Sequence, residues 1–224
     1  MIRISAVLLA FLLSVSAVQA SDNLLERYEF LHWFNKPPLV ESVICDTGRP
    51  VSLAPSRYDH VLVKECDSSG GWLLTKWISD GNAVFNGVGV ISKAWLTEFR
   101  DAEDQARLSG NGGWRDFKIQ KAEYPETIST KSKFQIVQGT VYAMKKHKGV
   151  FYLNFGSNWR EDFTAVIPSH LKARFNNESW NFDDLVNMSI RVRGTVRQYN
   201  GPFMEIEWPA QIEVLPTLND GAKE

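Results

Sequence analysis

Residues 189–197 alternate without exception between apolar or small side chains and polar ones. Successive side chains of a β-strand point to opposite faces, so this period of two predicts a strand with one buried face. Asn200-Gly201 follows closely and is typical of a tight hairpin turn, and residues 203–208 continue in an extended pattern. The segment therefore predicts an antiparallel hairpin. The residues expected to face inward are Ile190, Val192, Gly194 and Val196, and those expected to face outward are Arg191, Arg193, Thr195 and Arg197.

Three further strands and a helical stretch precede this hairpin. The first of these strands is interrupted by Gly139, which allows a barrel strand to bend sharply. Strand, strand, strand, helix, strand, strand is the order of the oligonucleotide- and oligosaccharide-binding (OB) barrel. We therefore expect a five-stranded OB fold over residues 134–215. The preceding strands are expected at 134–143, 150–155 and 162–167, and the helical stretch over 171–175 and 181–188.

A second domain is expected upstream. Residues 93–108 repeat apolar side chains at helical spacing, with Ser92 placed to cap this helix and Gly110 to end it. A shorter helix is expected at 72–78. The segment 121–133 is polar and lacks periodicity, which is typical of a linker. The fold class is thus mainly β with α (α+β), with a first domain over 21–120, a linker over 121–133, an OB domain over 134–215 and a tail over 216–224.

The N-terminus predicts export. Arg3 is followed by an apolar run over residues 4–13, and small residues stand at Val18 and Ala20, as they do before a signal-peptidase cut. The run is too short to cross a bilayer, which takes about 20 apolar residues. We therefore expect a signal peptide over residues 1–20 and a periplasmic or secreted protein without a membrane span in its mature part. A retained N-terminal anchor is the alternative.

Charge and cysteine content restrict the classes of ligand. With Arg3 removed, 24 basic residues stand against 26 acidic ones, which gives a formal charge of −2. Such a chain has no overall attraction for nucleic acid, so binding of a polyanion requires a local patch. Cys45 and Cys66 form either one disulfide or two separate thiols. The four histidines lack the spacing of metal ligands, and we predict no metal and no cofactor.

Four upstream segments form an ordered set, namely Gly71-Trp72-Leu73-Leu74, residues 77–84, residues 102–107 and Gly113-Trp114. In order and spacing this set resembles the C-terminal third of domains of the thermonuclease (staphylococcal-nuclease-like) family. The resemblance implies that the first domain is a truncated nuclease-like OB domain.

The residues with which that family performs catalysis have no counterparts in this sequence. Arg57-Tyr58-Asp59-His60 stands where the family has Asp-Arg-Tyr-Gly-Arg, so His60 replaces the arginine that clamps the phosphate. An imidazole lacks the planar fork of a guanidinium. No upstream stretch resembles the family's calcium-binding aspartates, first arginine or glutamate base. The resemblance therefore implies a catalytically deficient protein, and the alternative is an active metal-dependent phosphodiesterase with a rearranged site.

The C-terminal domain resembles the module that follows thermonuclease-like domains in exported bacterial proteins. This resemblance implies an architecture of signal peptide, nuclease-like domain and OB module, without a known ligand. The similar residues are 139–141, 152–156, 159–164, 192–194, 200–202 and 211–215.

The outer face of the OB barrel is the candidate binding site. OB barrels bind single-stranded nucleic acid by stacking bases on aromatic rings while cations follow the phosphates. We expect a binding module for single-stranded nucleic acid or another polyanion, and the alternative is a protein-binding scaffold in the envelope. In the alternative interpretation the arginines of 189–197 are a solvated face that pairs with Glu205 and Glu207, and residues 159–162 are a structural corner. The candidate binding residues are Lys145, Lys146, Lys148, Tyr152, Trp159, Arg160, Arg191, Arg193, Arg197 and Tyr199.

Overall fold

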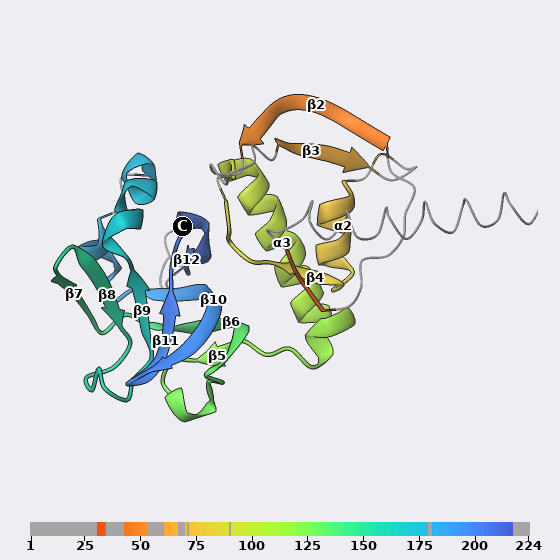
Figure 1. Cartoon of the computed structure of the whole chain (residues 1–224). Coiled ribbons are helices and arrows are strands. Elements are labelled where there is room, and N and C mark those ends of the chain that lie inside the picture. The colour runs from red at the N-terminus through yellow and green to blue at the C-terminus, as the bar shows by residue number, and fades with distance from the viewer. Residues whose placement is uncertain are drawn as a thin grey trace, which may run out of the picture. The chain divides into compact units, whose positions relative to one another are not determined.

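The chain forms two compact units (Figure 1). The computed structural model describes residues 31–34, 43–52, 61–66, 70, 72–89, 91–178 and 181–216. Unit 1 comprises Met1–Phe85 and Thr97–Gly113, and unit 2 comprises Asn86–Leu96 and Trp114–Glu224. The fold is α+β, and among the described residues no helix is long and apolar enough to cross a membrane. The expected signal peptide, the motif at residues 57–60 and the tail beyond residue 216 lie outside the described residues.

Unit 1 contains two helices that the spacing of apolar residues predicts to within one residue at each end. They are α2 (Leu73–Ser79) and α3 (Lys93–Ser109), of which the first turn counts with unit 2. The backbone N–H of Trp95 donates to the Ser92 hydroxyl at 3.3 Å, so the predicted cap is present. Gly110 follows α3 with a φ of +64°, a conformation that glycine adopts without strain. The buried side chains of the two helices include Leu73, Leu74, Trp77, Ile78, Phe99, Ala102 and Ala106.

Two antiparallel pairs of strands complete the described part of unit 1. The pairs are β1 (Leu31–Trp33) with β4 (Ala83–Phe85) and β2 (Val43–Ser52) with β3 (Val61–Cys66). Cys66 is buried and disulfide-bonded, and the only other cysteine of the sequence, Cys45, lies on the neighbouring strand β2. A cross-link between neighbouring strands stabilises a hairpin because it restricts the unfolded chain.

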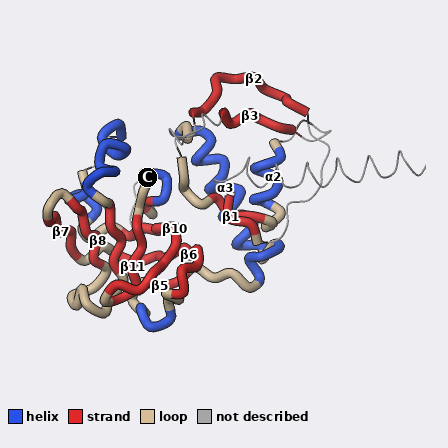
Figure 2. Tube along the Cα trace, viewed as in Figure 1, coloured by secondary structure: helices blue, strands red, loops and turns tan. Residues whose placement is uncertain are grey.

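Unit 2 contains an eight-stranded mixed sheet. Its strands are β5 (Gln120–Lys121), β6 (Lys131–Thr140), β7 (Ala143–His147), β8 (Val150–Asn154), β9 (Thr164–Ile167), β10 (Ser189–Tyr199), β11 (Gly201–Glu205) and β12 (Ile212–Val214). Their order is β5-β6-β10-β11-β9-β8-β7, with β12 paired to β10. β9 and β11 run parallel, and so do β5 and β6, whereas the other pairs are antiparallel. Two residues join β6 to β7, near the two ends of this order, so the sheet curls back on itself (Figure 2).

The strands expected within residues 134–215 are present with shifted limits. The first expected strand is two strands in the structure, because β6 ends at Thr140 and β7 begins at Ala143. Gly139 lies inside β6, where a Cβ atom would come within 2.6 Å of the Ala122 side chain. This glycine therefore permits the close approach of another segment, and the change of direction follows it. The expected helical stretch consists of two 3-10 segments, η3 (Ser169–Glu178) and η4 (Phe182–Leu185).

Apolar side chains fill the inner face of the sheet. Ile190, Val192 and Val196 are fully buried, as the alternation of β10 predicts. The same cluster contains Phe175 of η3 and Phe182 of η4, so the two 3-10 segments cover part of this core. Its other members include Val137, Leu153, Phe163, Ala165, Ile167 and Met204.

Residues 121–133, which their composition predicts to be a linker, are packed in unit 2. They contain the end of β5, a 3-10 turn at Pro125–Thr127 and the start of β6. Ala122 and Ile128 belong to the core cluster, and the Ala122 N–H donates to the Gln138 carbonyl at 2.9 Å. Two apolar residues and a short strand pairing suffice to hold this polar segment on the sheet.

Candidate binding face

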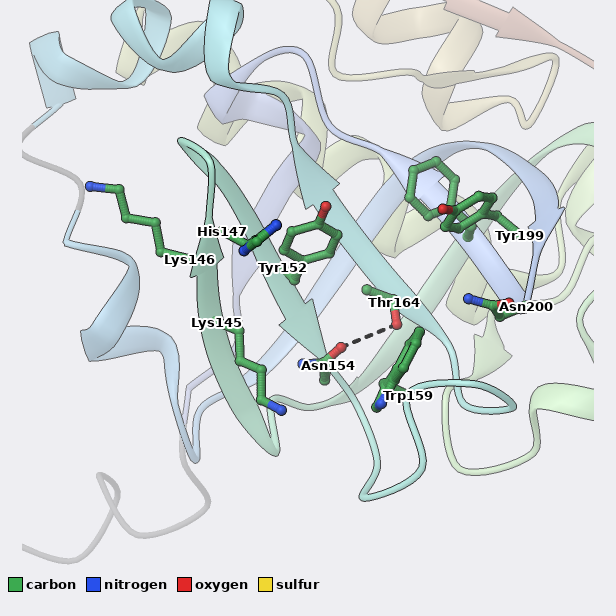
Figure 3. A pocket seen from close by; sticks show the side chains of 10 residues that line it. Lys145, Lys146, His147, Tyr152, Asn154, Trp159, Thr164, Tyr199 and Asn200 are labelled. Atoms are coloured by element: carbon green, nitrogen blue, oxygen red, sulfur yellow. Dashed lines mark hydrogen bonds between the residues drawn. The ribbon is translucent and has the colours of Figure 1, made fainter.

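A hollow of about 590 Å³ lies on the outer face of unit 2, over β7, β8 and β9 and beside the β10–β11 turn (Figure 3). We call it the first hollow. Aromatic side chains predominate in its walls, and amide, hydroxyl and cationic groups lie among them. The residues that line it are Lys145, Lys146, His147, Tyr152, Asn154, Trp159, Thr164, Tyr199, Asn200 and Phe203.

The pleat of the sheet brings the strand residues of the first hollow together. Leu153 of β8 belongs to the core, so its neighbours Tyr152 and Asn154 face outward. Tyr152 pairs with Lys145 of β7. Asn154 pairs with Thr164, which in turn pairs with Phe203 of β11. The outward rows of four neighbouring strands therefore converge on one surface.

A tight loop between β8 and β9 positions Trp159. The Asn158 N–H donates to the Asp162 carboxylate at 2.6 Å, and the Asn158 carbonyl accepts from the N–H groups of Glu161 and Asp162, both at 2.9 Å. These bonds fold the loop on itself and leave Trp159 45% exposed at its tip. The guanidinium of Arg160 lies over the indole, 4.5 Å from the ring centroid. One face of Trp159 therefore already has a cation on it.

The β10–β11 turn forms the opposite wall. Asn200 has a φ of +60° and Gly201 follows it, so the predicted hairpin turn is present. A Cβ atom on Gly201 would lie 2.4 Å from the Asp162 carbonyl oxygen, which shows how closely the turn approaches the Trp159 loop. Tyr199 is 70% exposed, and its ring lies 5.8 Å from that of Phe203.

The floor of the first hollow is polar and nearly buried. The Thr164 hydroxyl donates to the Asn154 side-chain carbonyl at 3.3 Å (Figure 3). This bond engages the oxygen of Asn154 and leaves its amide N–H groups for a ligand. A buried donor gives a site specificity, because a ligand without a matching acceptor leaves that donor unsatisfied.

Two lysines of β7 lie on different sides of their strand. Lys145 extends along the front of the first hollow, whereas Lys146 points away from it (Figure 3). The ammonium of Lys146 lies 5.3 Å from the Phe151 ring centroid, and Lys172 approaches the same ring at 6.0 Å. Among the described residues, no carboxylate forms an ion pair with Lys145. Lys145 is therefore the cation of this strand that is best placed to meet an anionic ligand.

The structure brings together five of the ten predicted binding residues around the first hollow. Arg160 is a neighbour through its stacking on Trp159, and Arg197 lines two adjacent hollows. Lys148 occupies the β7–β8 turn with a φ of +49° and does not line the first hollow. The five that line it are Lys145, Lys146, Tyr152, Trp159 and Tyr199.

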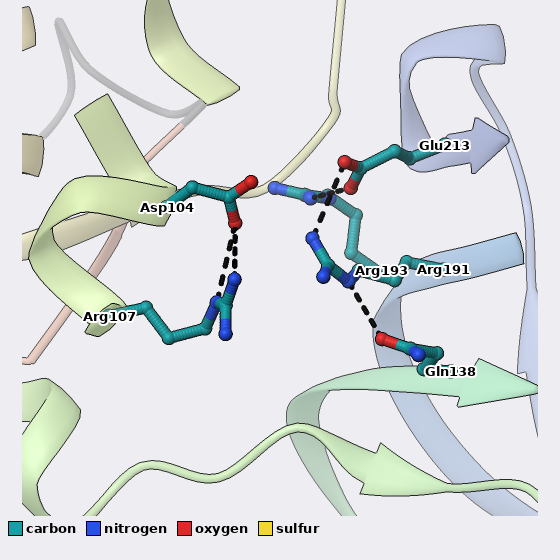
Figure 4. Close-up of polar contacts among 6 residues, drawn as sticks. All are labelled: Asp104, Arg107, Gln138, Arg191, Arg193 and Glu213. Carbon is teal, nitrogen blue, oxygen red and sulfur yellow. Dashed lines mark hydrogen bonds and ion pairs between the residues drawn. The ribbon is translucent and has the colours of Figure 1, made fainter. Parts of the chain in front are cut away.

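Arg191 and Arg193 point away from the core of unit 2, as the alternation of β10 predicts, but they are not exposed. Arg193 is fully buried and its guanidinium lies 3.0 Å from a carboxylate oxygen of Glu213 (Figure 4). Arg191 lies 3.4 Å from the other oxygen and donates to the Gln138 side-chain oxygen at 2.9 Å. The alternative interpretation of the sequence pairs these arginines with Glu205 and Glu207, whereas the structure pairs both with Glu213, which β12 places directly opposite Arg191.

Residues that the sequence did not single out complete the site. Asn154, Thr164 and Phe203 line the first hollow together with the predicted residues. The alternation of β8 and β11 could have identified two of them, since Asn154 and Phe203 each stand one residue away from an inward side chain and therefore face outward. Within the described part of the chain, no group of three or more His, Cys, Asp or Glu side chains is arranged to hold a metal ion.

Comparison with known proteins leaves the family of the chain open. No family description and no curated protein sequence matches it. Solved structures are similar only weakly. The OBody AM1L10 bound to hen egg-white lysozyme is 14% identical over 46% of this chain and all of its own, with a TM-score of 0.29.

Two other solved structures give the same result. A putative aspartyl-tRNA synthetase from Leishmania major Friedlin is 8% identical over 45% of this chain and 21% of its own, with a TM-score of 0.30. The p204 HINb domain is 11% identical over 60% of this chain and 59% of its own, with a TM-score of 0.33. Likenesses at this level carry no argument about function, which has to come from the site itself.

Proposed function

We propose that unit 2 is an OB-type module that binds single-stranded nucleic acid on the face around the first hollow. The observation that carries this proposal is the convergence of four aromatic side chains and Lys145 on one concave surface, which also has amide donors at its floor. Stacked bases contribute about 1–3 kcal/mol each at such platforms, and every base offers a flat face. The aromatic side chains are Tyr152, Trp159, Tyr199 and Phe203.

The strand pairings support the OB assignment. If β6 and β7 are counted as one bent strand, that strand pairs with β10 through its first part and with β8 through its second. The parallel pairing of β9 with β11 then closes a five-stranded Greek-key path. In OB barrels the face of the second and third strands and the loops beside it bind ligands. The first hollow lies over the corresponding strands, β8 and β9.

The proposal includes export and the absence of catalysis. The apolar run after Arg3 supports a signal peptide, and His60 in place of a phosphate-clamping arginine supports a catalytically deficient, thermonuclease-like first domain. The alternative, an active phosphodiesterase, requires divalent metal ions. Calorimetric titration with Ca²⁺ and Mg²⁺ distinguishes the two, because only the alternative predicts specific binding of either ion.

The first prediction concerns Trp159 and Tyr152. In residues 21–224, Trp159→Ala and Tyr152→Ala should each lower the affinity for a labelled oligothymidylate by about 5- to 150-fold, since each removes one stacking platform worth about 1–3 kcal/mol. Fluorescence anisotropy measures the affinity. Tyr124→Ala is the matched control, because Tyr124 is 54% exposed and lies outside the hollows described above.

Two results would count against nucleic acid as the ligand. One is equal affinity of all three variants and the parent protein. The other is binding that does not change between ~50 and ~200 mM salt, because contacts with phosphates release counterions and weaken as salt rises. An insensitive interaction would favour the alternative of a protein-binding module in the envelope.

A further inference from the structure

The first hollow continues into two others along the outer face of unit 2. A second hollow of about 430 Å³ shares Tyr152, Tyr199 and Phe203 with it. A third, of about 190 Å³, shares Phe203, Arg197 and Glu205 with the second. The shared residues make these hollows consecutive positions on one path, and an extended ligand that leaves the first hollow on this side must enter the second.

The charge along this path changes sign. Lys145 and Lys146 and no acidic residue line the first hollow, although the Lys146 side chain points away from it. In the second, Arg197 is opposed by Glu205. The third contains Arg197 together with two carboxylates, those of Glu205 and Glu207. Glu207 lies 3.7 Å from Arg174, but the Glu207 side chain is exposed, so this ion pair offsets little of the negative charge of Glu207.

This change from positive to negative charge along the path disfavours the binding of a continuous polynucleotide. Such a polymer carries one negative charge per nucleotide, so a chain that follows the path brings phosphates toward Glu205 and Glu207. Juxtaposed like charges oppose binding. The first hollow alone has a size typical of sites for small ligands, which occupy about 300–1,000 Å³.

We propose that the first hollow binds one end of a single-stranded nucleic acid, with a terminal phosphate at Lys145 and a terminal base on the aromatic side chains. Glu205 and Glu207 exclude the passage of a continuing chain. This inference rests on the proposed function and makes it more specific. The stacking of Arg160 on one face of Trp159 leaves the other face of the indole for this base.

Linear and circular single-stranded DNA test the inference, because a circle has no ends. Residues 21–224 should bind a linear oligothymidylate with a terminal phosphate at least tenfold more tightly than a circle of the same length. A dinucleotide with a 5′ or 3′ phosphate should retain most of this affinity. The slope of log K against log salt should be about −0.7 to −1.4, which corresponds to one or two phosphates.

Two sets of variants separate the roles of the charges. Lys145→Ala should remove the difference between phosphorylated and unphosphorylated dinucleotides. The double variant Glu205→Gln, Glu207→Gln should raise the affinity for the circle and leave that for the dinucleotide unchanged. The double variant Glu123→Gln, Glu126→Gln is the control, since it removes the same charge at exposed positions outside the three hollows.

Each remaining outcome overturns the inference in a distinguishable way. Equal affinity for the circle and the linear chain, or a slope of log K against log salt steeper than about −2, would mean that the nucleic acid runs through the site. The proposed function would then stand, but without the preference for an end. A mononucleotide that binds as tightly as the dinucleotide makes a free nucleotide the ligand. Failure of every probe to bind, with unchanged melting curves, removes the proposed function as well.

Discussion

Arg193 differs most from its expected environment, because it is buried where the sequence predicts an exposed side chain. This burial leads to a prediction about stability. The Arg193 side chain has no exposed surface and lies 3.0 Å from Glu213. Removal of one partner of a buried ion pair is strongly destabilising and costs about 3–5 kcal/mol. Glu213→Ala should therefore lower the free energy of unfolding, measured in urea, by about that amount.

Glu207→Ala is the control for Glu213→Ala, because it removes a carboxylate from an exposed ion pair. Glu207 is 55% exposed and its pairing with Arg174 is weak, so its removal should cost less than about 1 kcal/mol. If both substitutions cost the same, the cluster around Arg193 contributes no more than a surface ion pair. Affinity for nucleic acid should change little in Glu213→Ala, because neither Glu213 nor Arg193 lines the hollows described above.

For single residues, the sequence predicts to which face of a strand a side chain points, but not whether that side chain is buried. The alternation in 189–197 places Ile190, Val192 and Val196 inward, and the structure confirms it. The same alternation places Arg193 on the opposite face. Its burial depends on partners distant in sequence, such as Glu213 on β12, and a local pattern contains no information about them. The positions of Tyr152 and Trp159 around the first hollow were predictable, because aromatic side chains at outward positions stand out on a strand and in a loop.

The loop between β8 and β9 is the element that decides where Trp159 lies. The Asp162 carboxylate accepts a hydrogen bond from the Asn158 N–H, while the Glu161 side chain forms no hydrogen bond or ion pair within the described part of the chain. Asp162→Ala should lower the affinity for the oligothymidylate by about 1 kcal/mol or more, the value of one misplaced stacking contact. Glu161→Ala removes an equal charge from the same loop and should leave the affinity equal or slightly higher.

This comparison separates geometry from charge. If the negative charge near the hollow were the main influence of Asp162, both substitutions would raise the affinity by similar amounts. A decrease confined to Asp162→Ala shows instead that the folded loop positions Trp159. Anisotropy titrations at one salt concentration suffice, with melting curves to show that both proteins remain folded.

Whether the sequence predicts a helix or a strand depends on the length of that element. The helices α2 and α3 and the strand β10 contain enough residues for a period to be recognised. β5 has two residues and β12 has three, so no alternation can be read from them. Both nevertheless extend the sheet, and β12 carries the carboxylate that pairs with Arg191 and Arg193.

For the whole molecule, the division into units does not follow the order of the chain. Asn86–Leu96 counts with unit 2, although the sequence places it inside the first domain. A Cβ atom on Gly87 would lie 2.6 Å from the Gln211 side chain, so this segment packs closely on unit 2. Gln211 in turn donates to the Arg193 carbonyl at 2.9 Å and accepts from the N–H of Trp208. The contact between Gly87 and Gln211 joins residues more than 100 positions apart, and local composition does not reveal it.

The position of the boundary at 121–133 leads to a prediction about fragments. A fragment that begins at Trp114 retains Ala122, Ile128 and the contact between Phe117 and Phe134, whose ring centroids are 6.3 Å apart. A fragment that begins at Phe134 loses all of these, and burial of an isoleucine side chain alone contributes about 1.5–3 kcal/mol. The longer fragment should therefore unfold at a clearly higher temperature, measured by circular dichroism. Ile128→Ala in the longer fragment should reproduce much of the difference, whereas Thr127→Ala, at an exposed position, should not. Equal melting temperatures of the two fragments would restore 121–133 as a linker, because they would show that its buried residues contribute nothing to the stability of the sheet.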